Sequence, residues 1–333
     1  MGAFFVAAPR FNWLGMITLQ ELSEATRLTE SALRARLGEH ALVRVPGGRV
    51  CVPRLSVRDL LLSTQSDSFA PKVVTFVSLK GGVGKTTSAI TFAVRSAQYG
   101  WNTCVMDLDA QASATLAFDA IPEVDAPLFC DLWGEPDGMT EAAVVPIQDG
   151  LSLLPSALEN GMLDTALADP SDQLVAARGV AGALTRNGHE LIVIDCPPSL
   201  GTATISAICA ADIIVVPLVC DPYSVNAVQL TLKEIAAIQD NYRIPEPQVM
   251  LLVSRFDRRE RIGSELLEEL MASYPDKIVA RPIPVSTEFN RALAERQTIF
   301  DHHRSSTAKR EYDLFVRTLL GLHVGEGSPH KHG

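Results

Sequence analysis

The chain has 333 residues, 47% of them hydrophobic, and a formal net charge of −10 at neutral pH. Its length can hold one sizeable α/β domain and a smaller one, and 20% charged residues suit a soluble globule. No apolar run approaches the roughly 20 residues of a membrane span, and the first residues lack a basic n-region, so we expect a cytoplasmic protein that does not bind membranes.

The first predicted elements are two short helices around a tight turn in residues 18–37. Thr29 suits the N-cap of the second helix, on or near which Arg34 and Arg36 lie. Residues 43–52 predict a hairpin with Gly-Gly at its tip. The pattern resembles a helix-turn-helix with a wing, and its inward face is apolar: Leu19, Leu22, Ala25, Leu28, Ala32, Leu33 and Leu37.

Charge separates this amino-terminal part from the rest of the chain. Residues 1–70 carry eight arginines against six acidic residues, a net of +2, which leaves −12 for the remainder of a chain with −10. The module could read DNA through Arg34 and Arg36, or it could be a structural or dimerisation arm. We predict a module in residues 1–62, and a polar, Ser-rich segment ending in proline predicts a linker in 63–71.

A glycine-rich segment, residues 78–87, follows an apolar strand at 73–77 and opens a helix. Glycines let backbone N–H groups converge on an anion, and the helix start adds its positive dipole end. Lys85 can reach the terminal phosphates and Thr86 can ligate Mg²⁺. The segment predicts a nucleoside triphosphate bound by Gly81, Gly82, Val83, Gly84, Lys85, Thr86 and Thr87.

Carboxylates end two further apolar strands. Residues 102–111 predict a short strand followed by Asp107 and Asp109, and residues 190–198 predict a buried strand that closes on Asp195. An open parallel sheet places its ligand at the carboxyl ends of its strands. Asp195 would hold Mg²⁺ through water, as at the end of a Walker B strand. Taken alone, the Asp pair could equally be a turn or a helix cap.

The remaining chain alternates between strands and helices. Strands are predicted at 151–154, 191–194, 213–217 and 249–253, with helical stretches between them. Such alternation predicts an α/β domain in residues 72–322, a P-loop NTPase with a mostly parallel sheet and helices on both faces. A flexible tail is expected at 323–333.

An additional lysine, Lys80, distinguishes the glycine-rich loop from the ordinary pattern. The string Lys80-Gly81-Gly82-Val83-Gly84-Lys85-Thr86 resembles the deviant Walker A loop of the ParA/MinD family, and the resemblance covers about residues 72–321. It implies an ATP- and Mg²⁺-dependent homodimer in which Lys80 reaches the phosphates of the partner's nucleotide. The catalytic residues that it implies are Lys80, Lys85 and Asp109.

The resemblance also assigns roles to other residues. Asp109 matches the carboxylate that positions the attacking water and Asp107 the one that supports the loop, while Ala110 stands where the family usually has proline. Residues 251–259 are similar to the family's strand and loop near the nucleotide base. Pro284 and Val285 are similar to a later segment of the family's adenine pocket.

In function, the resemblance implies a partition ATPase in chromosome or plasmid segregation. Hydrolysis would be slow and stimulated by a ParB-like partner, and the ATP dimer would bind DNA without sequence preference, on the nucleoid. Arginines that follow a strand are candidates for DNA contact, although acidic residues between them could make this a solvated, salt-bridged face: Arg255, Arg258, Arg259 and Arg261.

Other function classes differ in what they require. A nucleotide-gated, sequence-specific transcriptional repressor, of its own gene or of another, would bind an operator through the amino-terminal module. This alternative stays open. A MinD-like division-site regulator needs a basic amphipathic helix at the carboxyl end, and residues 311–320 are followed by a Gly, Ser and His tail without a cationic stripe. The six cysteines lack the setting of a cluster-binding reductase, and the five tyrosines do not form the tail of a tyrosine autokinase.

Overall fold

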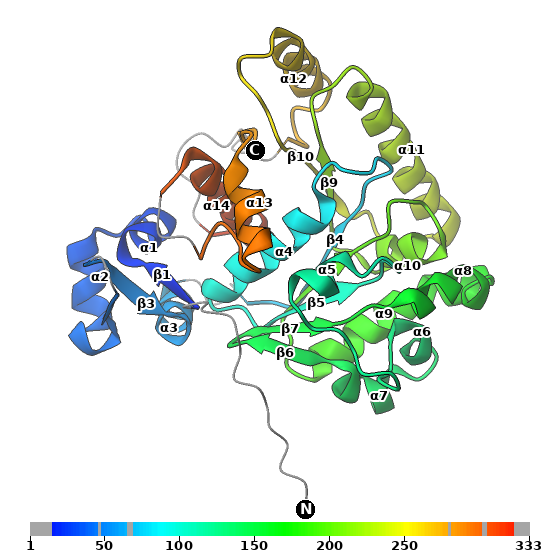
Figure 1. The fold of residues 1–333 in the computed structure, drawn as a ribbon, viewed down its shortest axis with the longest axis horizontal. Coiled ribbons are helices and arrows are strands. Elements are labelled where there is room, and N and C mark those ends of the chain that lie inside the picture. The colour runs from blue at the N-terminus through cyan, green and yellow to red at the C-terminus, as the bar shows by residue number, and fades with distance from the viewer. Residues whose placement is uncertain (1–14, 46–47, 65–68, 279–280, 302–304, 323–333) are drawn as a thin grey trace, which may run out of the picture.

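The fold is that of a computed structural model, which describes residues 15–45, 48–64, 69–278, 281–301 and 305–322. The tail expected at 323–333 and part of the hairpin tip, at 46–47, lie outside the described residues. Figure 1 shows a small amino-terminal module beside a larger α/β domain.

The larger domain is built on a seven-stranded sheet in the order β10-β9-β4-β8-β5-β7-β6. All neighbouring pairs are parallel except β6 with β7, which makes the sheet mostly parallel. The strands are β4 (Lys72–Phe76), β5 (Thr103–Asp107), β6 (Val145–Gln148), β7 (Leu151–Leu154), β8 (Leu191–Asp195), β9 (Ile213–Leu218) and β10 (Gln248–Val253). The predicted P-loop NTPase fold is confirmed.

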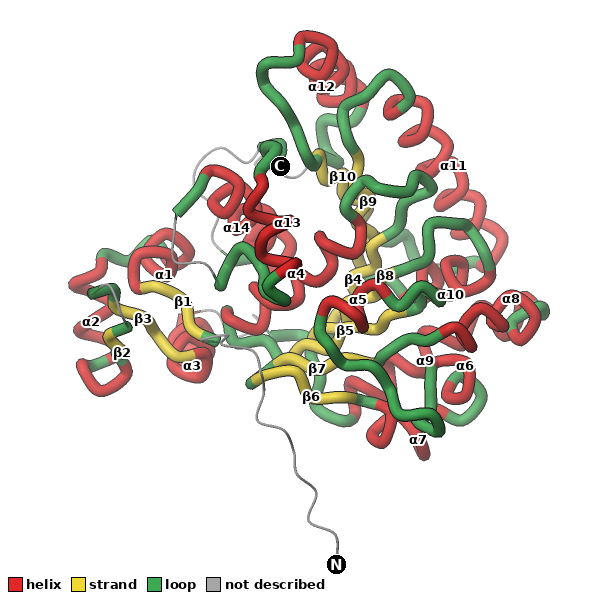
Figure 2. Tube along the Cα trace, in the orientation of Figure 1, coloured by secondary structure: helices red, strands yellow, loops and turns green. Residues whose placement is uncertain are grey.

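Helices cover both faces of this sheet (Figure 2). The α-helices are α4 (Lys85–Gln98), α5 (Ser113–Ala117), α6 (Phe129–Leu132), α7 (Pro136–Ala143), α8 (Leu163–Ala166), α9 (Pro170–Arg186), α10 (Thr202–Ala210), α11 (Ser224–Tyr242), α12 (Arg261–Ser273), α13 (Thr287–Ala294) and α14 (Thr307–Leu320), and one 3₁₀ turn is η2 (Leu158–Met162). Strand β8 carries four apolar residues without interruption, from Leu191 to Ile194, because both of its faces are buried.

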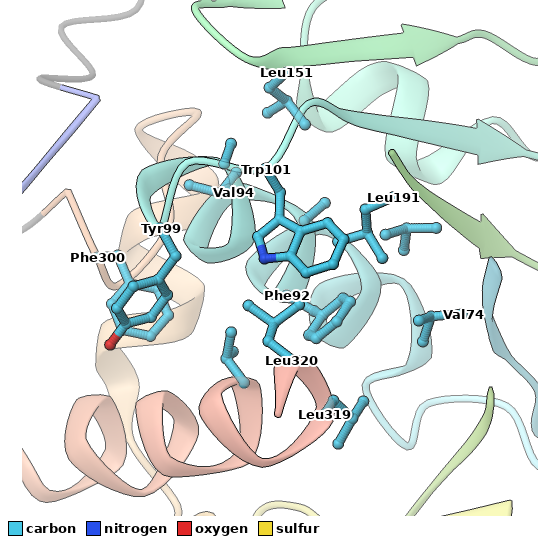
Figure 3. Close-up of a cluster of buried hydrophobic side chains, with 14 of the residues drawn as sticks. Val74, Phe92, Val94, Tyr99, Trp101, Leu151, Leu191, Phe300, Leu319 and Leu320 are labelled. Carbon is cyan, nitrogen blue, oxygen red and sulfur yellow. The ribbon is translucent and has the colours of Figure 1, made fainter. Parts of the chain in front are cut away.

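Alternation along each strand sorts its side chains between two apolar clusters. In β8, Leu191 and Val193 belong to the cluster under α4 and α14, whereas Ile192 and Ile194 belong to the cluster under α9, α10 and α11. Figure 3 shows the first cluster, in which Trp101 lies among side chains from strands and both helices. This packing fixes α4, the helix that follows the glycine-rich loop, against the sheet.

The amino-terminal module contains the two predicted helices and more. Its elements are β1 (Met16–Thr18), α1 (Leu19–Thr26), α2 (Glu30–Leu37), the 3₁₀ turn η1 (Glu39–Ala41), β2 (Val43–Arg44), β3 (Val50–Pro53) and α3 (Arg54–Thr64). Thr29 caps α2 as expected, because its side chain accepts a hydrogen bond from the Ala32 amide. Strand β1 pairs with β3, which turns the hairpin into a three-stranded sheet.

Helix α3 changes the boundary drawn from the sequence. It runs through Ser63 and Thr64, so the segment expected as a linker from residue 63 begins inside a helix. Leu60 and Leu61 of α3 are buried in the same apolar cluster as α4. The polar composition of 63–71 predicts a linker between two domains. Helix α3, however, packs its apolar residues into the core of the larger domain and so joins the module to it directly.

Candidate active site

The glycine-rich loop connects β4 to α4 at the carboxyl edge of the sheet. Gly82 and Gly84 adopt φ of +75° and +88°, a left-handed region that favours glycine. Apart from the adjoining residues of the chain, no heavy atom lies within 4 Å of a Cβ built at Gly81, Gly82 or Gly84. Helix α4 has Gly84 as its N-cap and no capping side chain, so its first amides face an open space that suits a phosphate chain.

Lys85 and Asp195 meet below this loop. The Lys85 Nζ lies 2.6 Å from Asp195 Oδ1 and 3.4 Å from Thr86 Oγ1. Burial raises the pKa of Asp195, against the lowering effect of Lys85. The second oxygen, Oδ2, is buried and has no hydrogen-bond partner among the residues described. A carboxylate with an unused oxygen beside a hydroxyl fits Mg²⁺, which prefers hard oxygen ligands.

Asp107 organises the loop that follows β5. Its Oδ2 accepts hydrogen bonds from the Thr115 amide at 2.9 Å and the Thr115 hydroxyl at 2.8 Å, and its Oδ1 accepts one from the Asp109 amide at 3.2 Å. Burial and the carboxylate of Asp195 on the neighbouring strand raise the pKa of Asp107 to about 7. These contacts hold the backbone of Asp109 at the strand end.

Asp109 itself lies just beyond β5 and is buried. Its Oδ1 accepts a hydrogen bond from the Gln111 amide at 2.9 Å, across Ala110. This short turn orients the carboxylate without the proline that the family pattern carries. Thr115 was not singled out from the sequence, because the contact with Asp107 spans eight residues and no local pattern marks it.

Lys80 turns back onto its own chain. Its Nζ forms an ion pair with Asp221, which follows β9, and both side chains are about one-third exposed. Burial opposes ionisation of Asp221, but hydrogen bonds from Lys80 and Ser224 outweigh it and lower its pKa. Asp221 was also missed, although a carboxylate just after a predicted buried strand is the signal by which Asp195 was found.

A cavity of about 360 Å³ adjoins the loop on the side of β10. Ser254 holds the backbone of the glycine-rich loop in place, because its Oγ donates a hydrogen bond to the Val83 carbonyl at 2.7 Å. Arg255, with φ of +52°, donates to the Gly82 carbonyl at 3.2 Å. The lining residues are Lys80, Gly81, Gly82, Val83, Val219, Cys220, Asp221, Arg255, Phe256, Asp257, Glu260 and Gly263.

The two segments expected near the nucleotide base lie side by side, but only one of them reaches the cavity. Residues 255–257 border the cavity, but Pro284 and Val285 are not on its wall. Both residues lie beside Phe256. Pro284 forms a parallel β-bridge with it, and the Val285 amide donates a hydrogen bond to the Phe256 carbonyl at 3.0 Å. Their expected role in an adenine pocket stays a prediction.

The candidate DNA-binding arginines differ in their surroundings. Arg259 pairs with Asp257 at 2.6 Å and Arg261 with Glu265 at 2.8 Å, both on the surface. Arg258 is exposed and has no ion pair within the described part of the chain. In the module, Arg34 pairs with Glu39 at 3.1 Å, whereas Arg36 is exposed.

Comparison with known proteins identifies the family. A family profile described as an AAA domain matches residues 71–245, more than half of the chain. The chromosome-partitioning ATPase Soj of Thermus thermophilus is 30% identical over 251 residues, which cover 74% of this chain and 94% of that protein. The chain belongs to the ParA/Soj family of partition ATPases. It is therefore an ATPase.

Other relatives agree with this assignment. The sporulation initiation inhibitor protein Soj of Bacillus subtilis is 24% identical over 242 residues, 72% of this ParA/Soj chain and 95% of that protein. A solved structure of Cyanothece McdA with ATP superposes with a TM-score of 0.69 at 20% identity, over 76% of this chain and 98% of that one, which shows a common fold. The family profile starts at residue 71, so the module lies outside it.

Among the helices that the structure describes, none is long and apolar enough to cross a membrane.

Proposed function

We propose that this ParA/Soj protein is an ATP-dependent dimeric ATPase that binds DNA in its ATP state and is released by hydrolysis, in chromosome or plasmid segregation. The observation that carries the proposal is the convergence of Lys80, Lys85, Asp109 and Asp195 on the carboxyl edge of one sheet. Cytoplasmic, nucleoid-associated localisation follows from DNA binding.

The residues divide the work of binding and hydrolysis. The amides of Gly81 to Thr87 and the Lys85 ammonium would hold the phosphates of ATP, and Thr86 with Asp195, through water, would hold Mg²⁺. Bound Mg²⁺ neutralises phosphate charge. Asp109 would accept a hydrogen bond from the attacking water and orient it, which is positioning rather than covalent chemistry. Slow turnover that depends on a ParB-like partner is consistent with this sparse machinery.

The ion pair of Lys80 with Asp221 bears on dimerisation. For Lys80 to reach the phosphates of a partner's nucleotide, this pair must open, because its ammonium now faces its own chain. The nucleotide of the second protomer supplies a stronger negative charge than one carboxylate. We infer that the dimer closes only when that charge is present.

A repressor is the second candidate function, and the module favours it. Two helices capped by Thr18 and Thr29, followed by a hairpin, form the layout of a helix-turn-helix with a wing. Footprinting separates the two functions, because an operator gives protection at a defined site whereas a partition ATPase coats DNA without register.

The experiment that tests the main proposal measures ATP hydrolysis by the purified protein, with and without non-specific duplex DNA. The mass in solution is measured in parallel with ATP and with ADP. Weak turnover that DNA increases, together with a dimer found only with ATP, is the expected result. Tight nucleotide binding without turnover would contradict it and favour the nucleotide-gated repressor.

A further inference from the structure

The amino-terminal module is anchored at the edge of the sheet where the strands begin. Arg54 and Arg58 of α3 both donate to the Gly100 carbonyl, at 3.2 and 2.8 Å. Arg58 also forms a two-pronged ion pair with Glu190, one bond of which is 2.7 Å. Gly100 lies just before β5 and Glu190 just before β8. Helix α3 therefore binds the amino edge of the sheet.

Close approach at this edge leaves no room for a side chain at residue 100. Gly100 has φ of +101°, and a Cβ built there would lie 2.7 Å from the Cβ of Arg58. Phe69 packs on Trp101 with ring centroids 5.0 Å apart, and the Arg58 guanidinium lies 4.2 Å above the Phe69 ring. The module and the ATPase domain are in van der Waals contact here.

A second anchor joins α1 to α4 and α14. Arg95 in the last turn of α4 is 1% exposed, and its Nη2 lies 3.7 Å from Glu21 Oε1. Lys309 of α14 lies 3.1 Å from the same oxygen, and Arg317 donates to the Glu24 carbonyl at 3.0 Å. Two separate anchors, on α1 and on α3, fix the orientation of the module as well as its position.

The anchors and the nucleotide site lie at opposite edges of the sheet. Helix α4 starts at the glycine-rich loop and runs back to Arg95, and its 14 residues span about 21 Å. Figure 1 shows the module beyond this far end of α4. In the proposed dimer the two carboxyl edges face each other, so the modules lie at the outer ends, about 40 Å or more apart.

The outer face of the module suits a duplex. Figures 1 and 2 show α2 as the part of the module farthest from the ATPase domain, whereas α1 and α3 lie beside that domain. Exposed arginines are present on α2 and on the hairpin beside it: Arg36, Arg44 and Arg49. A helix that projects with cations around it can enter a major groove while the flanking arginines contact phosphates.

We propose that each module binds its own DNA duplex, so that the ATP-closed dimer joins two DNA segments. This inference rests on the proposed dimer. Helix-turn-helix dimers that read one palindrome place their recognition helices about 34 Å apart on the same face of a duplex. Modules fixed at opposite ends of a dimer face away from each other and cannot do so, and the two rigid anchors prevent them from swinging together.

A two-duplex capture assay tests this. The full chain is incubated with a biotinylated random-sequence duplex on beads and a fluorescent random-sequence duplex in solution, at low salt, with ATP or ADP, and its mass is measured in the same buffers. We expect capture of the fluorescent duplex with ATP only. Arg36→Glu with Arg44→Glu should reduce capture at least about tenfold and leave the ATP dimer and ATP hydrolysis intact.

The matched control is Arg186→Glu with Arg243→Glu, which reverses two exposed arginines of the ATPase domain and should leave capture unchanged. An ATP dimer that captures no second duplex would overturn the inference and leave the proposed function standing. Failure to dimerise with ATP would instead remove the proposed function and this inference with it. Capture that persists in the Arg36 and Arg44 variant would assign the joining of duplexes to another surface and overturn the inference.

Discussion

Asp109 is the single side chain on which the proposed hydrolysis depends most directly. It is held at the end of β5 by Asp107 and by its own turn to Gln111. Asp109→Ala removes the carboxylate that orients water but leaves the phosphate-binding loop intact. We expect ATP-dependent dimers whose phosphate release falls by about 100-fold or more. Normal turnover in this variant would remove Asp109 from the role.

Asp221 restrains Lys80 in the isolated chain. Asp221→Asn keeps the shape of the side chain but removes its charge, so Lys80 is freer to reach a partner's nucleotide. An exposed pair of this kind contributes about 1 kcal/mol or less, so the ATP concentration at which half the protein is dimeric should fall by up to about fivefold. Mass measurements across an ATP titration check this, with Asp137→Asn, which breaks the surface pair with Arg186, as the control.

Glu21 connects the charge state of one residue to stability. Burial disfavours its ionisation, but the charges of Arg95 and Lys309 and the hydrogen bonds from Thr18 outweigh it and lower its pKa from 4.5 to about 2. Because the pKa of Glu21 is lower in the folded protein than in the unfolded chain, its ionised carboxylate stabilises the fold. This contribution is complete above pH 4.5 and is lost as the pH falls toward 2. In urea unfolding, the free energy of unfolding of the wild type should exceed that of Glu21→Gln by about 3 kcal/mol near neutral pH. This difference should disappear as the pH falls from 4.5 toward 2. A difference independent of pH would show that Glu21 acts through packing.

At the scale of elements, α3 decides whether the module and the ATPase domain behave as one unit. Arg58→Ala removes the ion pair with Glu190, the hydrogen bond to Gly100 and the contact with Phe69. Loss of charged hydrogen bonds that are partly buried should cost about 2 kcal/mol of the free energy of unfolding. Denaturant titration measures it, against Arg186→Ala, whose pair with Asp137 is exposed on both sides and should cost little.

At the scale of the whole molecule, DNA binding by the ATPase domain should depend on salt. Figure 1 places α12, which follows Arg258 and Arg259, far from the module, so this surface can be tested separately. Arg258→Glu with Arg259→Glu should weaken non-specific duplex binding by the ATP form at least about tenfold and reduce the salt slope by about 2. Unchanged affinity in a fluorescence titration would make these arginines part of a solvated face, as the pairing of Arg259 with Asp257 allows. The double variant at Arg186 and Arg243 again serves as the control.

The sheet, the glycine-rich loop and most of the candidate site can be predicted from consecutive residues of the sequence. Buried strands need apolar residues on both faces, and a phosphate loop needs glycines between a strand and a helix, so both leave a mark in consecutive residues. Asp109 and Asp195 were found because they end such strands. The two helices of the module were found from their apolar period and the Thr29 cap.

Contacts between distant segments become visible only in the folded chain. Asp221 forms an ion pair with Lys80, and Thr115 donates a hydrogen bond to Asp107. Pro284 and Val285 lie beside Phe256 and do not reach the cavity wall. The place of the module depends on contacts of Arg54 and Arg58 with residues up to 132 positions away, and on the hydrogen bond from Arg317 to Glu24, 293 positions away. Such contacts depend on how packed helices and strands bring distant segments together, and nothing in the neighbouring residues of the chain encodes them.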